Sequence, residues 1–199
     1  MTARPPTKKF EEYAYVLDHL PRGYPEDTRP IFKKDPIVQA VGDTYFTLLE
    51  LVPRKGARFS PQESIFIGRD RRDKIDHVKR RITFDILTAT ARSELPFVIE
   101  KLVEKTEPRF VDFFNNARPL TTRMHSLELL PGIGKKLMWD ILEERRKALF
   151  TSFQDVAERT QIRAPKEIIV KRILMELGGE DKYHLFTRKP VAEKEQNRS

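Results

Sequence analysis

Short runs of alternating apolar and polar residues extend from Tyr13 to about Phe84 and are typical of β-strands. Gly42-Asp43 separates two of these runs at the spacing of a hairpin. Five strands suit a small barrel, so we predict an OB-like β-barrel over residues 11–86. The expected strands are residues 13–17, 37–41, 45–52, 64–67 and 77–82. Residues 21–36 carry four prolines and are predicted to form a long extended loop.

The apolar period becomes helical after Phe84. Residues 93–96, Ser-Glu-Leu-Pro, have the composition of a helix start, with the proline near the first turn. Linking helices are therefore expected over residues 87–117, and two helix pairs over 118–180. The second pair ends at Gly178-Gly179, an expected helix stop. Residues 1–10 and 181–199 have few apolar positions and are expected to be disordered. The predicted fold class is α+β, with a barrel followed by an all-α domain.

The segment Leu130-Pro131-Gly132-Ile133-Gly134 connects the first helix pair and precedes Lys135 and Lys136. Pro131 presets φ, and the two glycines accept positive φ, so the segment can turn sharply and direct backbone N–H groups outward. These donors adjoin a helix start, where the helix dipole also attracts anions. The segment therefore predicts a phosphate site. The structural alternative is a tight turn between two helices.

These five residues resemble the helix-hairpin-helix motif of proteins that bind nucleic acid without sequence specificity. The resemblance implies a core role for Ile133 and backbone contacts for Gly132, Gly134 and Lys135. Some members of that family also hold a monovalent cation on the hairpin carbonyls, which is the one cofactor that the motif suggests. Residues 160–163, Thr-Gln-Ile-Arg, occupy the corresponding place in the second helix pair but lack the glycines. Phosphate binding is expected to be weaker or absent there.

Other cations cluster near the expected last strand and upstream of the hairpin. Arginine pairs with phosphate and stacks on bases, so both clusters are candidate nucleic-acid contacts. The alternatives are a solvated charged surface for the first cluster and, for the second, ion pairs with carboxylates such as Glu94 or Asp112. His125 precedes Ser126, which is expected to cap the following helix. The candidate arginines are Arg71, Arg72, Arg80 and Arg81 in the first cluster and Arg118 and Arg123 in the second.

Composition agrees with a polyanionic partner. The 199 residues carry a formal charge of +8 and contain no cysteine, which excludes disulfides and thiolate metal sites. The sequence has no apolar stretch of membrane-spanning length and no apolar leader near Met1, so a cytoplasmic protein without membrane contact is expected.

No catalytic motif is evident in the sequence. The four histidines are widely separated, and the closest acidic group, Asp140, Glu143 and Glu144, lies beside basic residues and is interpreted as helix-surface pairing. We therefore expect a protein that is not an enzyme and has no catalytic or metal-ligating residues.

Over about residues 11–177 the chain resembles the family called domain of unknown function 655, described as nucleotide- or RNA-binding proteins. The resemblance is most specific at residues 12–18, 87–96 and 123–136. It implies an OB-like barrel joined to a helix-hairpin-helix domain. The expected function is binding of a sugar-phosphate backbone, RNA ahead of DNA. The alternatives are a protein-interaction adaptor whose hairpin is only a turn, and an unrecognised nuclease or RNA-modifying enzyme.

Overall fold

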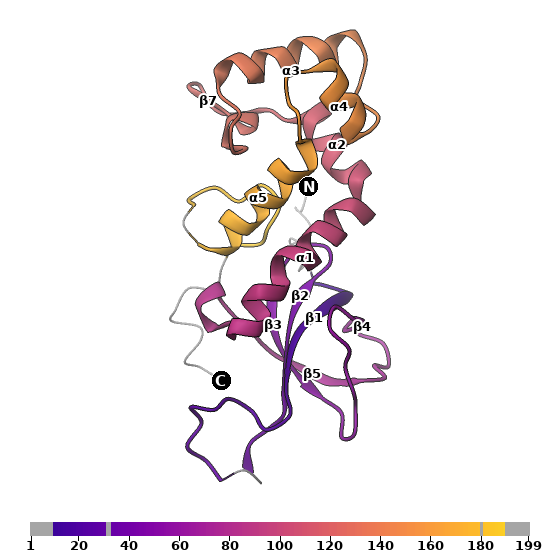
Figure 1. The fold of residues 1–199 in the computed structure, drawn as a ribbon, viewed down its shortest axis with the longest axis vertical. Coiled ribbons are helices and arrows are strands. Elements are labelled where there is room, and N and C mark those ends of the chain that lie inside the picture. The colour runs from indigo at the N-terminus through magenta and orange to yellow at the C-terminus, as the bar shows by residue number, and fades with distance from the viewer. Residues whose placement is uncertain (1–9, 31–32, 180, 190–199) are drawn as a thin grey trace, which may run out of the picture. The chain divides into compact units, whose positions relative to one another are not determined.

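The computed structural model describes residues 10–30, 33–179 and 181–189 and divides the chain into two compact units (Figure 1). Unit 1 runs up to Leu95 and resumes at Thr187, whereas unit 2 comprises Pro96–Phe186. The fold is mixed α and β, as the sequence predicts. The expected disorder of residues 1–9 and 190–199 concerns residues outside the described ones.

Unit 1 is built on one antiparallel sheet with the strand order β4-β1-β2-β3-β5 (Figure 1). The sheet is curled into a half-barrel, which is consistent with an OB-like barrel left open between its edge strands, β4 and β5. All five predicted strands are present. They are β1 (Tyr13–Leu20), β2 (Ile37–Gly42), β3 (Leu48–Pro53), β4 (Ser64–Phe66) and β5 (Ile75–Arg81).

One face of the sheet forms an apolar core because alternate residues of each strand point to the same side. Val38 lies opposite Leu51, and Ala40 lies opposite Leu49, so these side chains share that face. The core cluster comprises Ala14, Val16, Val38, Ala40, Leu49, Leu51, Ile65, Ile67 and Ile75, with Phe59 and Val78 packed against it.

The third strand begins at Leu48, three residues later than predicted. The carboxylate of Glu11 accepts hydrogen bonds from the main-chain N–H groups of Thr44, Tyr45 and Thr47, at 3.0–3.1 Å. These donors are therefore not available for a strand ladder, and Phe46 between them adopts a φ of 53°. The aromatic and β-branched residues at positions 45–47 predict a strand. The carboxylate of Glu11, which is distant in sequence, instead holds these residues in a loop.

The opposite face of the sheet carries a buried polar network. Gln39, which is fully buried, donates to Tyr24 Oη at 2.8 Å and to the Ile86 carbonyl at 3.0 Å, and accepts from Thr88 N–H at 2.9 Å. Tyr24 Oη in turn donates to Glu50. The predicted proline-rich loop thus contributes Tyr24 to the network, and Gln39 links the sheet to the segment that enters the first helix.

That helix, α1 (Ala89–Lys105), begins four residues before the predicted start at Ser93. Thr88 Oγ1 accepts the N–H of Ala91 at 3.0 Å and so supplies the cap that was expected near Ser93. Pro96 therefore lies inside the helix rather than in its first turn. The division between the two units falls immediately before this proline. The short 3-10 helix η2 (Phe84–Ile86) precedes α1.

The remaining elements of unit 2 include two short strands that the sequence did not predict. The apolar stripes of the helices converge on a core that contains Phe110, Leu127, Ile141 and Ile173, each fully buried. The elements are α2 (Glu107–Asn116), β6 (Pro119–Thr121), β7 (Met124–His125), η3 (Ser126–Leu129), α3 (Lys135–Lys147), α4 (Phe153–Arg159) and α5 (Pro165–Leu177).

Residues 181–189 differ from the expected disordered tail. The main-chain N–H groups of Leu185 and Phe186 donate to the buried carboxylate of Glu176, at 2.8 and 3.1 Å. Arg172, 2 % exposed, binds the same carboxylate as well as Asp181. The low apolar content of this segment suggested disorder, but its order comes from main-chain hydrogen bonds to a buried acid, which composition does not reveal.

Candidate nucleic-acid interface

The hairpin before α3 is a tight turn closed by one main-chain hydrogen bond. Ile133 N–H donates to the Leu130 carbonyl at 3.0 Å, and Gly132 adopts a φ of 81°, as a type II turn with Pro131 at its second position requires. The Ile133 side chain is only 4 % exposed. Ile133 therefore has the core role that the motif implies and offers neither its side chain nor its N–H to a ligand.

The two glycine amides have no hydrogen-bond partner within the described part of the chain. Added Cβ atoms at Gly132 and Gly134 would meet nothing within 4 Å, so both positions open onto solvent. Gly134 is the N-cap of α3, whose first turn contains the exposed Lys135 and Lys136 and no acidic residue. Two glycine amides, the unpaired donors of the helix start and two lysines thus lie together.

A reciprocal capping box braces the segment that enters the hairpin. His125 Nδ1 accepts the N–H of Leu127 at 3.2 Å, and Glu128 accepts the N–H of His125 at 2.7 Å. Burial, followed by the charge of Arg145, holds the pKa of His125 below its usual value and so preserves this acceptor. The cap expected at Ser126 is therefore wrong: His125 caps η3, and Ser126 Oγ donates to the Arg118 carbonyl at 2.7 Å.

Arg118 and Arg123 lie before and within the β6–β7 turn, and both are exposed. Among the described residues of unit 2, neither guanidinium pairs with a carboxylate; the proposed ion pair with Asp112 is not formed. Both therefore keep an uncompensated charge in the segment leading to the hairpin.

The second hairpin, between α4 and α5, differs from the first. The N–H of Gln161 donates to Asp140 Oδ2 at 3.1 Å, and the N–H of Ile162 donates to Thr160 Oγ1 at 3.2 Å. Ile162 is 2 % exposed, as Ile133 is 4 %, so the buried hydrophobe is common to both hairpins. The N–H groups of Gln161 and Ile162 are thus satisfied by the protein itself.

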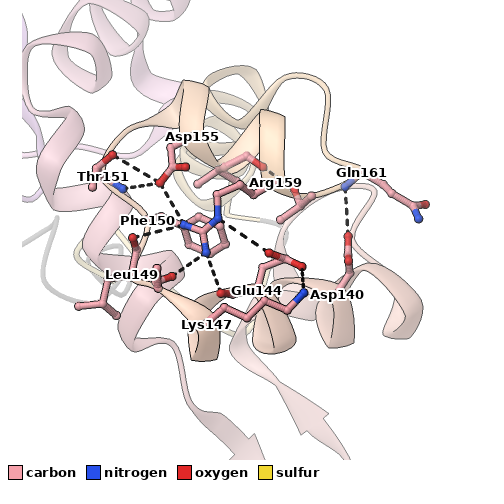
Figure 2. A network of polar contacts seen from close by, with 12 residues as sticks. Asp140, Glu144, Lys147, Leu149, Phe150, Thr151, Asp155, Arg159 and Gln161 are labelled. Carbon is pink, nitrogen blue, oxygen red and sulfur yellow. Dashed lines mark hydrogen bonds and ion pairs between the residues drawn. The ribbon is translucent and has the colours of Figure 1, made fainter.

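Figure 2 shows the polar network that fixes the connection between α3 and α4, with Arg159 at its centre. This guanidinium donates to the carbonyls of Glu144 and Ala148, both at 2.7 Å, at the end of α3. It also pairs with Asp155 at 3.2 Å and lies over the ring of Phe150. Glu144 pairs with Lys147 at 2.6 Å and with Arg159 at 3.8 Å, so the predicted surface pairing is present for this one of the three α3 acids.

Strand alternation puts the adjacent Arg80 and Arg81 of β5 on opposite faces, and a bulge between Val78 and Arg80 sets which face each one takes. Arg81 pairs with Leu49 and shares its core face, whereas Arg80 pairs with Glu50 on the other face. Arg80 makes a two-point ion pair with the fully buried Glu50, at 2.8 Å for each contact. Its charge is therefore compensated. Arg71 is exposed in the loop after β4.

Three of the predicted arginines, Arg72, Arg80 and Arg81, line one hollow of unit 1. Sequence reasoning missed Arg188, which joins them from the far end of the chain, and also left Arg69 out of the candidate set. It also missed Trp139, which is 59 % exposed one turn after Lys135 on α3. An apolar ring on the polar side of an otherwise amphipathic helix was the available signal.

The described residues contain neither a candidate metal site nor a candidate membrane-spanning helix. No three His, Asp or Glu side chains in that part of the chain gather in an arrangement that could hold a metal ion. None of the described helices combines the length and apolarity needed to cross a membrane.

Comparisons with known proteins agree with this architecture. An uncharacterised protein of Methanocaldococcus jannaschii is 49 % identical over 183 residues, which cover 91 % of this chain and 82 % of that protein. The crystal structure of Af1531 from Archaeoglobus fulgidus superposes with a TM-score of 0.82 at 48 % identity, covering 89 % of this chain and all of the other. The family described as "Protein of unknown function (DUF655)" matches residues 10–188, and the chain belongs to that family.

Proposed function

We propose that this protein binds nucleic acid through the sugar-phosphate backbone, without sequence preference and without catalysis, in the cytoplasm. The hairpin before α3 is the contact, and it acts as a helix-hairpin-helix motif. The observation that carries the proposal is the pair of open amides at Gly132 and Gly134, beside Lys135 and Lys136. A phosphodiester accepts hydrogen bonds from such amides, and the lysines and helix dipole add attraction.

The second hairpin supports the anion preference of this backbone arrangement. There a carboxylate, that of Asp140, accepts the N–H of Gln161, which corresponds to Gly132 in the first hairpin. The first hairpin has the same backbone donor but no acid of the described chain bound to it. An external anion would complete it.

Trp139 favours RNA over DNA as the partner. Its ring lies four residues after Lys135, and residues at that spacing are neighbours on a helix surface. Exposed aromatic rings stack on unpaired bases, and RNA presents such bases in loops and single strands. Trp139 is also the only tryptophan of the chain, so its fluorescence reports binding at this helix directly.

The test measures binding of labelled single-stranded RNA and DNA of several sequences by fluorescence anisotropy, over a range of salt concentrations. Affinity should fall steeply with salt. In a plot of log affinity against log salt concentration, each phosphate contact on a single strand should steepen the slope by about 0.7. The variant G132A/G134A should lose about tenfold in affinity for every sequence, because the added methyl groups keep a phosphate away from the two amides and the positive φ of Gly132 disfavours alanine. Trp139 fluorescence should change on binding.

Gly56 supplies a matched control. Its φ is 80°, its added Cβ also meets nothing within 4 Å, and it lies in unit 1, so G56A carries the same backbone strain as G132A. The single variant G134A adds no such strain, because the φ of Gly134 is −89°. Equal affinity in G132A/G134A and wild type would overturn the proposal. Binding that hardly responds to salt would instead indicate an apolar protein-docking surface.

A further inference from the structure

A hollow of about 670 Å³ opens on the core side of the half-barrel in unit 1. Its walls come from β3, β5, the segment after β4, the residues before β1 and the segment around Arg188. The edge strands β4 and β5 do not pair, so the inner face of the sheet stays accessible at this point. The volume lies within the range of small-ligand sites.

The rim of the hollow is strongly cationic. Five arginines line it, against one acid, Glu11, whose carboxylate is already bound by three main-chain N–H groups. Arg72 is held in place by the carbonyls of Gly68 and Asp76, at 2.8 and 3.2 Å, and forms no direct ion pair with a carboxylate of the described residues. Of the five, Arg80 directs its guanidinium to the buried Glu50 on the opposite face of the sheet and so adds no charge to the hollow.

The floor of the hollow is apolar. Leu49 and Ile67, each 4 % exposed, and Val78 belong to the core face of the sheet. Phe10, 54 % exposed, borders the same space, with the guanidinium of Arg69 over its ring at 5.2 Å. A bare anion would leave the apolar floor uncovered, and an apolar molecule would leave the charges of Arg69 and Arg72 without a counter-ion. A ligand that fits both has a flat ring and an anionic group.

We propose that this hollow binds one nucleotide, with its base against Leu49, Val78 and Phe10 and its phosphate toward Arg69 and Arg72. The nucleotide is either free or the 5′-terminal residue of a polynucleotide, since both present the same ring and phosphate. The site belongs to unit 1 and the hairpin to unit 2. Each proposal can therefore fail without the other.

The test is titration calorimetry of the full chain with adenosine 5′-monophosphate, adenosine and inorganic phosphate. The nucleotide should bind at least about tenfold more tightly than either fragment. R69Q removes one rim charge and V78F fills the floor while keeping every charge, and each should weaken nucleotide binding about tenfold. K79Q is the matched control: it removes an exposed charge from the same strand at a residue that does not line the hollow.

The outcomes separate the alternatives. Absence of nucleotide binding, an unchanged affinity in V78F, or phosphate alone binding as tightly as the nucleotide would overturn the proposal, as would an equal loss in K79Q. In G132A/G134A, nucleotide affinity should stay at the wild-type value. Competition by an oligonucleotide with a 5′-phosphate, but not by one with a 5′-hydroxyl, supports the site and identifies a chain end as its ligand. Binding of the nucleotide without such competition supports the site with a free nucleotide as its ligand.

Discussion

The main-chain N–H of Gln161 donates to Asp140 Oδ2 at 3.1 Å, so a carboxylate of α3 occupies the second hairpin at the place where the first has an open glycine amide. Both hairpins keep a buried isoleucine. The buried hydrophobe is thus common to both hairpins, whereas the amide that precedes it is open only in the first.

This relationship predicts a gain of function. In the double variant D140A/Q161G the second hairpin loses its internal acceptor and acquires a glycine, so it should bind a second phosphate. We expect RNA affinity to rise several-fold and the salt slope to steepen by about 0.7, both measured by fluorescence anisotropy.

The control for this experiment is E143Q, which removes one negative charge from an exposed position of the same helix. A gain of affinity in E143Q equal to that in D140A/Q161G would show that net charge, and not the freed amide, is responsible. D140N, which keeps an acceptor for Gln161, should behave like the wild type.

The parts of the fold that were predictable from sequence are those determined by neighbouring residues. The five strands follow from apolar alternation, the end of α5 from Gly178-Gly179, and the hairpin turn from Pro131 and Gly132. In each case the deciding interactions, a backbone preference or a local hydrogen bond, lie within a few residues.

The parts that sequence could not supply depend on distant partners. Glu11 determines the loop at Thr44–Thr47 from more than 30 residues away, and Arg188 reaches the unit 1 hollow from the far end of the chain. The adjacent Arg80 and Arg81 look equivalent in sequence. Alternation puts them on opposite faces, but the bulge after Val78 decides that Arg80 meets Glu50 and Arg81 lies opposite Leu49, and no local pattern predicts that bulge.

The lowered pKa of His125 predicts that acidification destabilises unit 2. Its folded pKa lies below the ordinary value of 6.5, chiefly because of burial and then because of the Arg145 charge. The unfolded chain therefore takes up a proton first as the pH falls below about 6.5, and stability decreases until the folded pKa is passed. Protonation also removes the Nδ1 acceptor of the capping box.

The variant H125N isolates this effect. Asparagine is a good N-cap residue and does not titrate, so the variant should lose less stability than the wild type between pH 7.5 and pH 5, measured by urea unfolding. The pKa of His19 is also lowered by burial, so the variant H19N measures how much this histidine of unit 1 contributes to the loss of stability at low pH. If the stability of wild type and H125N depended on pH in the same way, His125 would not be a cause of the acid destabilisation.

The ion pair of Arg80 with Glu50 predicts that Arg80 stabilises the folded protein, whether or not a ligand binds. Burial alone would raise the pKa of Glu50, but the hydrogen bonds from Arg80 and Tyr24 lower it below its usual value. In R80Q the buried carboxylate keeps only the Tyr24 hydroxyl, and we expect a loss of about 1–3 kcal/mol in the free energy of unfolding at pH 7.

The deficit of R80Q should shrink on acidification. Without Arg80, burial raises the pKa of Glu50, so the folded variant takes up a proton before the unfolded chain does and gains stability relative to wild type as the pH falls. Urea unfolding at pH 7 and pH 4.5 measures both quantities. K79Q removes only the smallest of the contributions that lower the pKa of Glu50, so its loss and its pH dependence should be much smaller than those of R80Q. A deficit in R80Q that is constant with pH would place its cause outside the buried carboxylate.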